Sequence, residues 1–226
     1  MNPIICALDT QDLSEAVSLA NALRGKVGIV KLGLEFFAAH GPSGVREVAK
    51  CNIPIFLDLK LHDIPNTVAK TVETIKALGV EILTLHINGG TRMLKEALSV
   101  VKDAKMKLIG VTILTSIGNE DLNELGVTKE VKSQVILLAK LAKKIGLHGI
   151  VCSALEAQEV RKECGKNFTI ITPGIRVDSS RDDQKRIETP KEAISSGADH
   201  IVIGRPITKS DSPANRAELI WKSLIN

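Results

Sequence analysis

Short apolar runs recur along the whole chain and are separated by longer amphipathic segments. Each run is rich in β-branched residues and is almost uninterrupted by polar ones, which is typical of parallel strands that are covered on both faces. We therefore predict strands at residues 4–8, 28–32, 54–58, 82–86, 107–111, 148–152, 169–172 and 200–204.

The segments between these runs repeat their apolar residues at helical spacing. Residues 12–24 place their apolar side chains on one stripe, and Asp12 or Ser14 can cap the start of the helix. Residues 66–79 repeat the pattern and end at Gly79, where a C-terminal capping glycine is expected. Further helices are predicted near residues 91–103, 129–145, 153–163, 189–197 and 213–224.

The alternation of strands and helices predicts an α/β fold, a single (β/α)8 TIM-barrel domain over residues 1–226. An open, doubly wound sheet is the alternative, but no GxGxxG fingerprint follows any of the predicted strands. Two connections, residues 113–127 and 173–189, are longer than the rest. Long loops after barrel strands lie at the catalytic face, so we expect both to border the functional site.

Composition and charge exclude several other classes of protein. The net charge is only +4, no block of Lys or Arg is present, and aromatic residues make up 2% of the chain, which disfavours nucleic-acid binding. The cysteines (Cys6, Cys51, Cys152 and Cys164) form no CxxC pair and are expected to be reduced thiols. No basic leader and no apolar stretch of about 18 residues is present, so we expect a cytoplasmic protein without a membrane partner.

Charged side chains gather where the predicted strands end. In the stretch "FLDLKLHDIPNT", Asp58 and Lys60 occupy alternate positions of an extended chain, so both are expected on the same face at the mouth of the barrel. A single Asp–Lys pair there would be an ordinary ion pair of the rim. Removing several charges from water is costly, however, and their convergence is better explained by a catalytic use. The other charges at or beyond strand ends are Asp9, Lys31 and Asp63.

The position of Lys60 between two aspartates predicts its chemistry. Neighbouring anions favour the charged form of a lysine, which suits proton donation to a carbanion. Schiff-base catalysis would need the free amine instead. The five histidines are scattered without the spacing of metal ligands, and we expect no metal.

A further group of residues follows the last two predicted strands. "TPGIR" ends at Arg176 after the seventh strand, and "IGRPI" places Gly204 and Arg205 after the eighth. Barrels often bind phosphate with these two loops. Glycine permits close approach of the backbone, and arginine offers a planar fork to phosphate oxygens. The pattern therefore predicts a substrate that carries a phosphate group.

Taken together, these motifs resemble those of the orotidine 5′-phosphate decarboxylase family. "FLDLKLHDIPNT" matches the signature D-x-K-x-x-D-I-x-x-T. The resemblance implies decarboxylation of orotidine 5′-monophosphate to UMP in de novo pyrimidine biosynthesis, with no cofactor. The first motif alone is shared with related sugar-phosphate barrels, but further motifs occur in the family's order along nearly the full chain: "ALD" (7–9), "KLG" (31–33), "LTS" (114–116), "TPGIR" (172–176), "DDQKR" (182–186) and "IGRPI" (203–207).

The resemblance also implies roles for individual residues. Lys60 would deliver the proton to the ring carbon that loses carbon dioxide, beside Asp58. Asp63 and Thr67 would reach across a homodimer interface into the partner's site. The implied catalytic residues are Lys60, Asp58, Lys31 and Asp63, and the implied substrate-binding residues are Asp9, Lys31, Asp58, Ile64, Thr67, Thr115, Ser116, Pro173, Arg176, Gln184, Gly204 and Arg205.

Two other functions stay open. A magnesium-dependent phosphosugar enzyme, such as a hexulose-phosphate synthase or a keto-gulonate-phosphate decarboxylase, shares D-x-K-x-x-D but would not be expected to carry "HDIPNT" together with "TPGIR" and "DQKR". A non-catalytic nucleotide-binding barrel would be expected to have lost Asp58 or Lys60, and both are present.

One departure from the family is the short segment "VDSSRDD", in place of the longer glycine-bearing insert of many bacterial relatives. This segment bears on lid closure rather than on the reaction.

Overall fold

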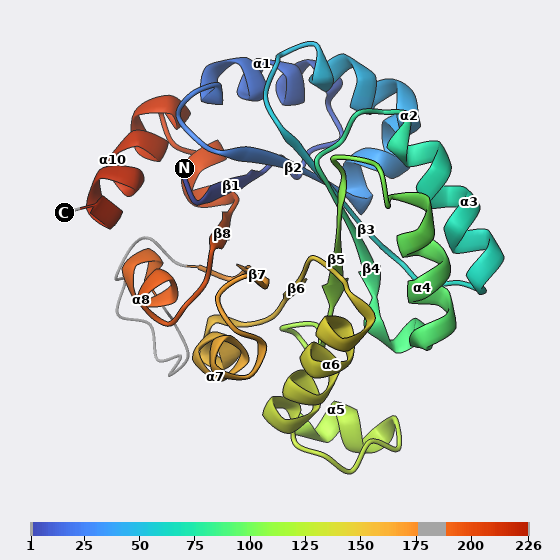
Figure 1. The fold of residues 1–226 in the computed structure, drawn as a ribbon. Coiled ribbons are helices and arrows are strands. Elements are labelled where there is room, and N and C mark those ends of the chain that lie inside the picture. The colour runs from blue at the N-terminus through green and yellow to red at the C-terminus, as the bar shows by residue number, and fades with distance from the viewer. Residues whose placement is uncertain (1, 176–188, 226) are drawn as a thin grey trace.

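The computed structural model describes residues 2–175 and 189–225, and within them eight parallel strands close into a barrel (Figure 1). Neighbouring strands pair in chain order, and the last strand pairs with the first. The predicted (β/α)8 barrel is therefore confirmed, and each predicted strand is present. The strands are β1 (Ile4–Ala7), β2 (Ile29–Gly33), β3 (Ile55–Leu61), β4 (Ile82–His86), β5 (Lys107–Val111), β6 (Gly149–Val151), β7 (Thr169–Thr172) and β8 (His200–Ile203).

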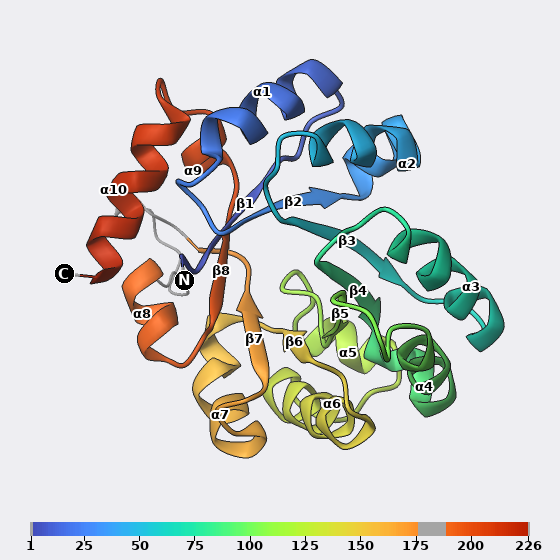
Figure 2. The same ribbon diagram turned by 45° about the horizontal axis from the view of Figure 1, so that its top comes forward.

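Helices surround the barrel on its outer side (Figure 2). Asp12 caps the first of them, because its carboxylate accepts hydrogen bonds from the backbone N–H groups of Ser14 and Glu15. None of the described helices is long and apolar enough to cross a lipid bilayer. The helices are α1 (Leu13–Leu23), α2 (Leu34–Ala49), α3 (Pro65–Lys76), α4 (Gly90–Val100), α5 (Asn119–Glu124), α6 (Val131–Ile145), α7 (Ala154–Cys164), α8 (Pro190–Ser195), α9 (Arg205–Thr208) and α10 (Pro213–Ile225), with a 3-10 turn η1 (Ile87–Gly89) before α4.

Helix α2 is the main element that periodicity does not predict. Its sequence contains Gly41 and Pro42, and Gly41 has a non-helical backbone conformation (φ 54°, ψ −153°) that kinks the helix. The kink interrupts the apolar repeat on which the prediction of helices depends. A smaller difference concerns Gly79, because α3 already ends with Ala77 as its C-cap and Gly79 turns the chain after it with φ 72°.

Side chains of the strands fill both faces of the barrel wall. One set points inward and forms a cluster that includes Ile5, Ile29, Phe56, Ile109 and Ile171, all buried. The alternate residues pack outward against the helices in a larger cluster. Because the barrel interior is filled by side chains, a substrate can bind only at an end of the barrel.

Candidate active site

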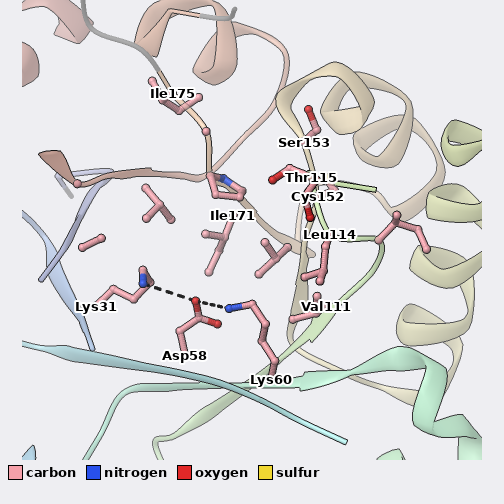
Figure 3. Close-up of a pocket in the computed structure, with 18 of the residues that line it drawn as sticks. Lys31, Asp58, Lys60, Val111, Leu114, Thr115, Cys152, Ser153, Ile171 and Ile175 are labelled. Carbon is pink, nitrogen blue, oxygen red and sulfur yellow. Dashed lines mark hydrogen bonds and ion pairs between the residues drawn. The ribbon is translucent and has the colours of Figure 1, made fainter. Parts of the chain in front are cut away.

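Charged side chains from the first three strands meet at the carboxyl end of the barrel. The ammonium nitrogen Nζ of Lys60 lies 2.8 Å from Oδ2 of Asp58, and Nζ of Lys31 lies 3.7 Å from the same oxygen. Lys31 Nζ is also 3.2 Å from Oδ1 of Asp9, just beyond β1. Asp58 therefore stands between two ammonium groups, as Figure 3 shows. We call Asp9, Lys31, Asp58 and Lys60 the charge array.

The members of the charge array differ in their access to solvent. The side chains of Lys31 and Asp58 are only 11% and 12% exposed, whereas Lys60 is 29% exposed and Asp9 is 56% exposed. Charges that are removed from water must be compensated by partners of opposite sign. The array meets this need internally, with two cations and two anions, and it leaves Lys60 accessible to a bound molecule.

The local course of β3 explains how Asp58 and Lys60 come together. Leu57 pairs with Leu83 and Leu61 pairs with Leu85, so residues 58–60 of β3 stand opposite the single residue Thr84 of β4. Such a bulge re-aims side chains and is common next to active sites. Lys60 has a left-handed backbone conformation (φ 50°), which is rare for a residue other than glycine. The prediction that Asp58 and Lys60 face the same way is confirmed, but the sequence alternation does not reveal the bulge.

A pocket of about 1140 Å³ opens above the charge array. Thr115 and Ser116 border it from the connection between β5 and α5, and Gly204 and Arg205 border it after β8. The structure thus brings most of the predicted site residues to one cavity. Those that line it are Asp9, Lys31, Asp58, Lys60, Thr115, Ser116, Pro173, Gly204 and Arg205.

The remaining predicted residues lie elsewhere. Asp63 and Thr67 border a smaller hollow of about 340 Å³, which Lys60 also borders. The carboxylate of Asp63 accepts a hydrogen bond from the backbone N–H of Ile64, at 2.6 Å, and Ile64 itself is 67% exposed. In the part of the chain that the structure describes, no ion pair joins Asp63 to the lysines of the charge array, although Lys60 borders the same hollow. Arg176 and Gln184 lie outside the described residues.

Gly33 is a site residue that the sequence analysis did not single out, although it belongs to the quoted "KLG". It ends β2, and a Cβ atom at this position would lie 3.2 Å from Nζ of Lys31 and 3.5 Å from Oδ1 of Asp9. Even the smallest side chain would therefore press against the ion pair. The motif itself was the available signal, since a glycine two residues after a buried lysine leaves space for its ammonium group.

Two neighbouring groups are kept uncharged by their surroundings. Burial raises the pKa of the Cys6 thiol to about 12, and the nearby Asp9 charge adds to the shift, so the thiol is not a nucleophile. Burial also lowers the pKa of His86 at the end of β4, and the positive charge of Lys60 acts in the same direction. The His86 and His62 rings lie 5.5 Å apart.

Among the described residues, no group of three His, Cys, Asp or Glu side chains is arranged to hold a metal ion.

The fold and the site together define a class of protein. A closed parallel barrel, with a pocket and converging charges at the carboxyl ends of its strands, is the architecture of (β/α)8-barrel enzymes.

Within this class, the chain belongs to the Orotidine 5′-phosphate decarboxylase / HUMPS family, whose sequence model matches residues 2–220. It is 81% identical over 224 residues to the orotidine 5′-phosphate decarboxylase of Wolbachia sp. subsp. Brugia malayi, covering 99% of this chain and all (100%) of that protein. It is 54% identical to the enzyme of that name from Ehrlichia canis, covering 99% and 98% of the two chains. The crystal structure of orotidine 5′-phosphate decarboxylase from Lactobacillus acidophilus superposes with a TM-score of 0.86 at 35% identity, with both chains covered completely (100%).

Proposed function

We propose that this protein is a carboxy-lyase that converts orotidine 5′-monophosphate to UMP in de novo pyrimidine biosynthesis. Its membership of the family and its full-length relatives named orotidine 5′-phosphate decarboxylase support the proposal. The observation that carries it is the buried Asp58 carboxylate held between the ammonium groups of Lys31 and Lys60 at the floor of the pocket.

The reaction needs a cation at the carbon that loses its carboxylate. When the bond to the carboxylate breaks, carbon dioxide leaves and the electron pair remains on the ring carbon. The Lys60 ammonium stabilises this developing anion, and then transfers a proton to it to form the new C–H bond. Lys60 is left as a neutral amine and regains its proton from solvent. A charge that is already in place when the anion forms costs no reorganisation during the reaction.

Asp58 gives the ammonium its position. Its Oδ2 lies 2.8 Å from Lys60 Nζ. Asp58 would also lie beside the carboxylate of the bound substrate. Asp9 and Lys31 would bind the ribose hydroxyls, and Thr115 and Ser116 would meet the edge of the pyrimidine. Pro173, Gly204 and Arg205 line the pocket on the side of β7 and β8 and would receive the phosphate, together with Arg176. Gln184 would connect the phosphate with the base. Binding energy from the remote phosphate can then be used at the reacting carbon.

We also propose that a second copy of the chain covers the hollow bordered by Asp63 and Thr67. Lys60 borders this hollow as well as the main pocket, so a partner seated there would lie next to the reacting group. The exposed side chain of Ile64 beside it is an apolar contact that a partner would bury. In this arrangement, Asp63 and Thr67 of each chain complete the site of the other.

Mixed dimers test this arrangement. Lys60→Ala and Asp63→Ala chains are each expected to have low activity, and a mixed dimer of the two contains one site with both changes and one unaltered site. Activity should therefore rise when the two variants are mixed and allowed to exchange subunits. If Asp63 acted within its own chain, both sites would stay defective and mixing would restore nothing. A monomer by sedimentation at assay concentration would also contradict the arrangement.

Free, buried cysteines are typical of proteins in a reducing compartment, and all four cysteines here are of this kind. We therefore propose that the enzyme works in the cytoplasm.

The loss of the orotate absorbance tests the proposed function directly. Mixing orotidine 5′-monophosphate with the purified protein should produce UMP, and EDTA should leave the rate unchanged. A rate that falls with EDTA and returns with Mg²⁺ would favour the phosphosugar enzymes. Binding of the nucleotide without any change in absorbance would favour a non-catalytic barrel.

A further inference from the structure

Thr84 occupies a special place in the barrel wall. It is the single residue of β4 that stands opposite residues 58–60 of the β3 bulge, and its side chain is fully buried. A bulge interrupts the ladder of backbone hydrogen bonds between strands. The backbone N–H of Lys60 therefore needs another acceptor, and it donates to the hydroxyl oxygen Oγ1 of Thr84 at 3.0 Å.

The same hydroxyl group also contacts the catalytic carboxylate. Thr84 Oγ1 donates its proton to Oδ1 of Asp58 at 2.9 Å, while Oδ2 of Asp58 accepts from Lys60 Nζ at 2.8 Å. The direction of each bond is fixed, because a carboxylate only accepts and a backbone N–H only donates. A hydroxyl can do both, so Thr84 closes a ring that runs from the Lys60 backbone through Asp58 to the Lys60 ammonium.

We propose that Thr84 is a positioning residue of the active site, which holds the Asp58 carboxylate and the left-handed backbone of Lys60 in one fixed arrangement. This inference rests on the proposed function and deepens it. With the Thr84 hydroxyl, both oxygens of Asp58 have a bound partner and its carboxylate plane is fixed. Without it, the carboxylate can rotate, and the Lys60 backbone loses the bond that compensates its unfavourable conformation.

Other buried threonines in the barrel provide a matched control. Thr112 is buried just after β5, and its hydroxyl donates to the backbone carbonyl of Val151 at 2.8 Å. Thr84 and Thr112 therefore share residue type, burial and one hydroxyl bond donated to a neighbour. They differ in the neighbour, which is a charged group of the site for Thr84 and a backbone carbonyl for Thr112.

Replacement of each threonine by valine keeps the shape and removes the hydroxyl. Thr84→Val should lower kcat by about 10- to 100-fold, by analogy with the cost of losing a group that orients a metal-binding side chain. Dissociation constants for UMP should stay unchanged, because the contacts to ribose and phosphate are intact. Thr84→Ser, which retains the hydroxyl, should keep most of the activity. Thr112→Val should lower the stability of the protein but leave kcat unchanged. For every variant, kcat is calculated from the concentration of sites that bind UMP.

Hydrogen exchange of the Lys60 amide gives a second readout that does not depend on turnover. Exchange should become faster in Thr84→Val and stay unchanged in Thr112→Val. If valine prevents folding, Thr84→Cys serves the same purpose, because a thiol is a weak donor and acceptor. Wild-type kcat in Thr84→Val or Thr84→Cys, or an equal loss in Thr112→Val, would overturn the inference. If the unaltered protein does not convert orotidine 5′-monophosphate, the proposed function fails, whereas the exchange experiment still decides whether Thr84 holds Lys60.

Discussion

The two halves of the barrel mouth present opposite chemistry to the same pocket. The half formed by β1 to β3 contributes the charge array, whereas the strands β5 to β8 contribute apolar side chains, and polar residues such as Thr115 and Arg205 follow only in the loops beyond them (Figure 3). The electrostatic interaction of a charge with a bound molecule is stronger when the opposite wall excludes water, because the local dielectric constant is lower. Under the proposed function, the charged half would perform the reaction and hold the ribose, while the other half would bind the phosphate and the base and exclude water from the site. The apolar residues are Val111, Val151, Ile171 and Val202.

The largest effect is expected from the charged half. Lys60→Ala should reduce kcat by at least about 1000-fold, because it removes both the stabilising charge and the proton donor. Binding of UMP should persist, since the proposed phosphate contacts do not involve Lys60. Calorimetric titration with UMP and a decarboxylation assay check the two expectations on the same preparation.

Lys50→Ala is the matched control for this change. Lys50 forms an exposed ion pair with Glu47 at 2.7 Å, far from the pocket, so its removal should not alter turnover. Near-normal turnover of Lys60→Ala would show that the charged half is not the reacting half.

A smaller effect, and of a different kind, is expected from the other half. Arg205→Ala should raise KM by about 10- to 100-fold, the range for losing hydrogen bonds to a charged phosphate. The change in kcat should be smaller than the change in KM, because Arg205 would bind the phosphate and not the ring carbon at which the bond breaks.

Arg205→Lys tests the geometry of this contact, because lysine keeps the charge but not the planar fork, and it should restore KM only in part. Arg92→Ala, which removes an exposed arginine paired with Glu96, is the control. An unchanged KM in Arg205→Ala would place the phosphate elsewhere.

The smallest effect concerns stability rather than turnover. Burial lowers the pKa of His86 at the end of β4, and of His148 and His200 elsewhere in the barrel. Unfolding frees these histidines to take up protons below their ordinary pKa of about 6.5. The unfolded state then binds more protons, so the free energy of unfolding should fall as the pH drops from 7 to 5.5.

Urea denaturation at several pH values measures this slope. His148→Asn should reduce this slope, because asparagine does not take up a proton in this pH range. Asparagine can still accept the hydrogen bond that His148 receives from the backbone N–H of Leu108, so the fold is kept. A slope that is unchanged in His148→Asn would contradict the account for that residue.

Predictability from the sequence also differs between parts of the molecule. The strands were predictable because a buried parallel strand is an apolar run, and Asp58 and Lys60 were conspicuous because they interrupt one. Helix α2 was not predictable from periodicity, because Gly41 and Pro42 break its repeat. Thr84 was also missed, since a threonine inside "ILTLH" reads as an ordinary β-branched strand residue.

The bulge illustrates why the rest of the site could not be predicted. Residues 57–61 alternate between apolar and charged as in a regular strand, and only the pairing with β4 shows that Thr84 faces residues 58–60. The register between strands far apart in the chain depends on tertiary packing, which a local pattern does not contain. The expectation for Asp63 has a different difficulty, because it concerns a contact with another chain.

An experimental structure of the protein with bound UMP tests the central claim most directly. The account predicts that the Lys60 ammonium points at the pyrimidine carbon that bears the new hydrogen, while still in contact with Asp58, and that the phosphate lies against Gly204 and Arg205. A nucleotide bound in the reverse orientation, or a Lys60 side chain turned away from Asp58 and the base, would contradict it.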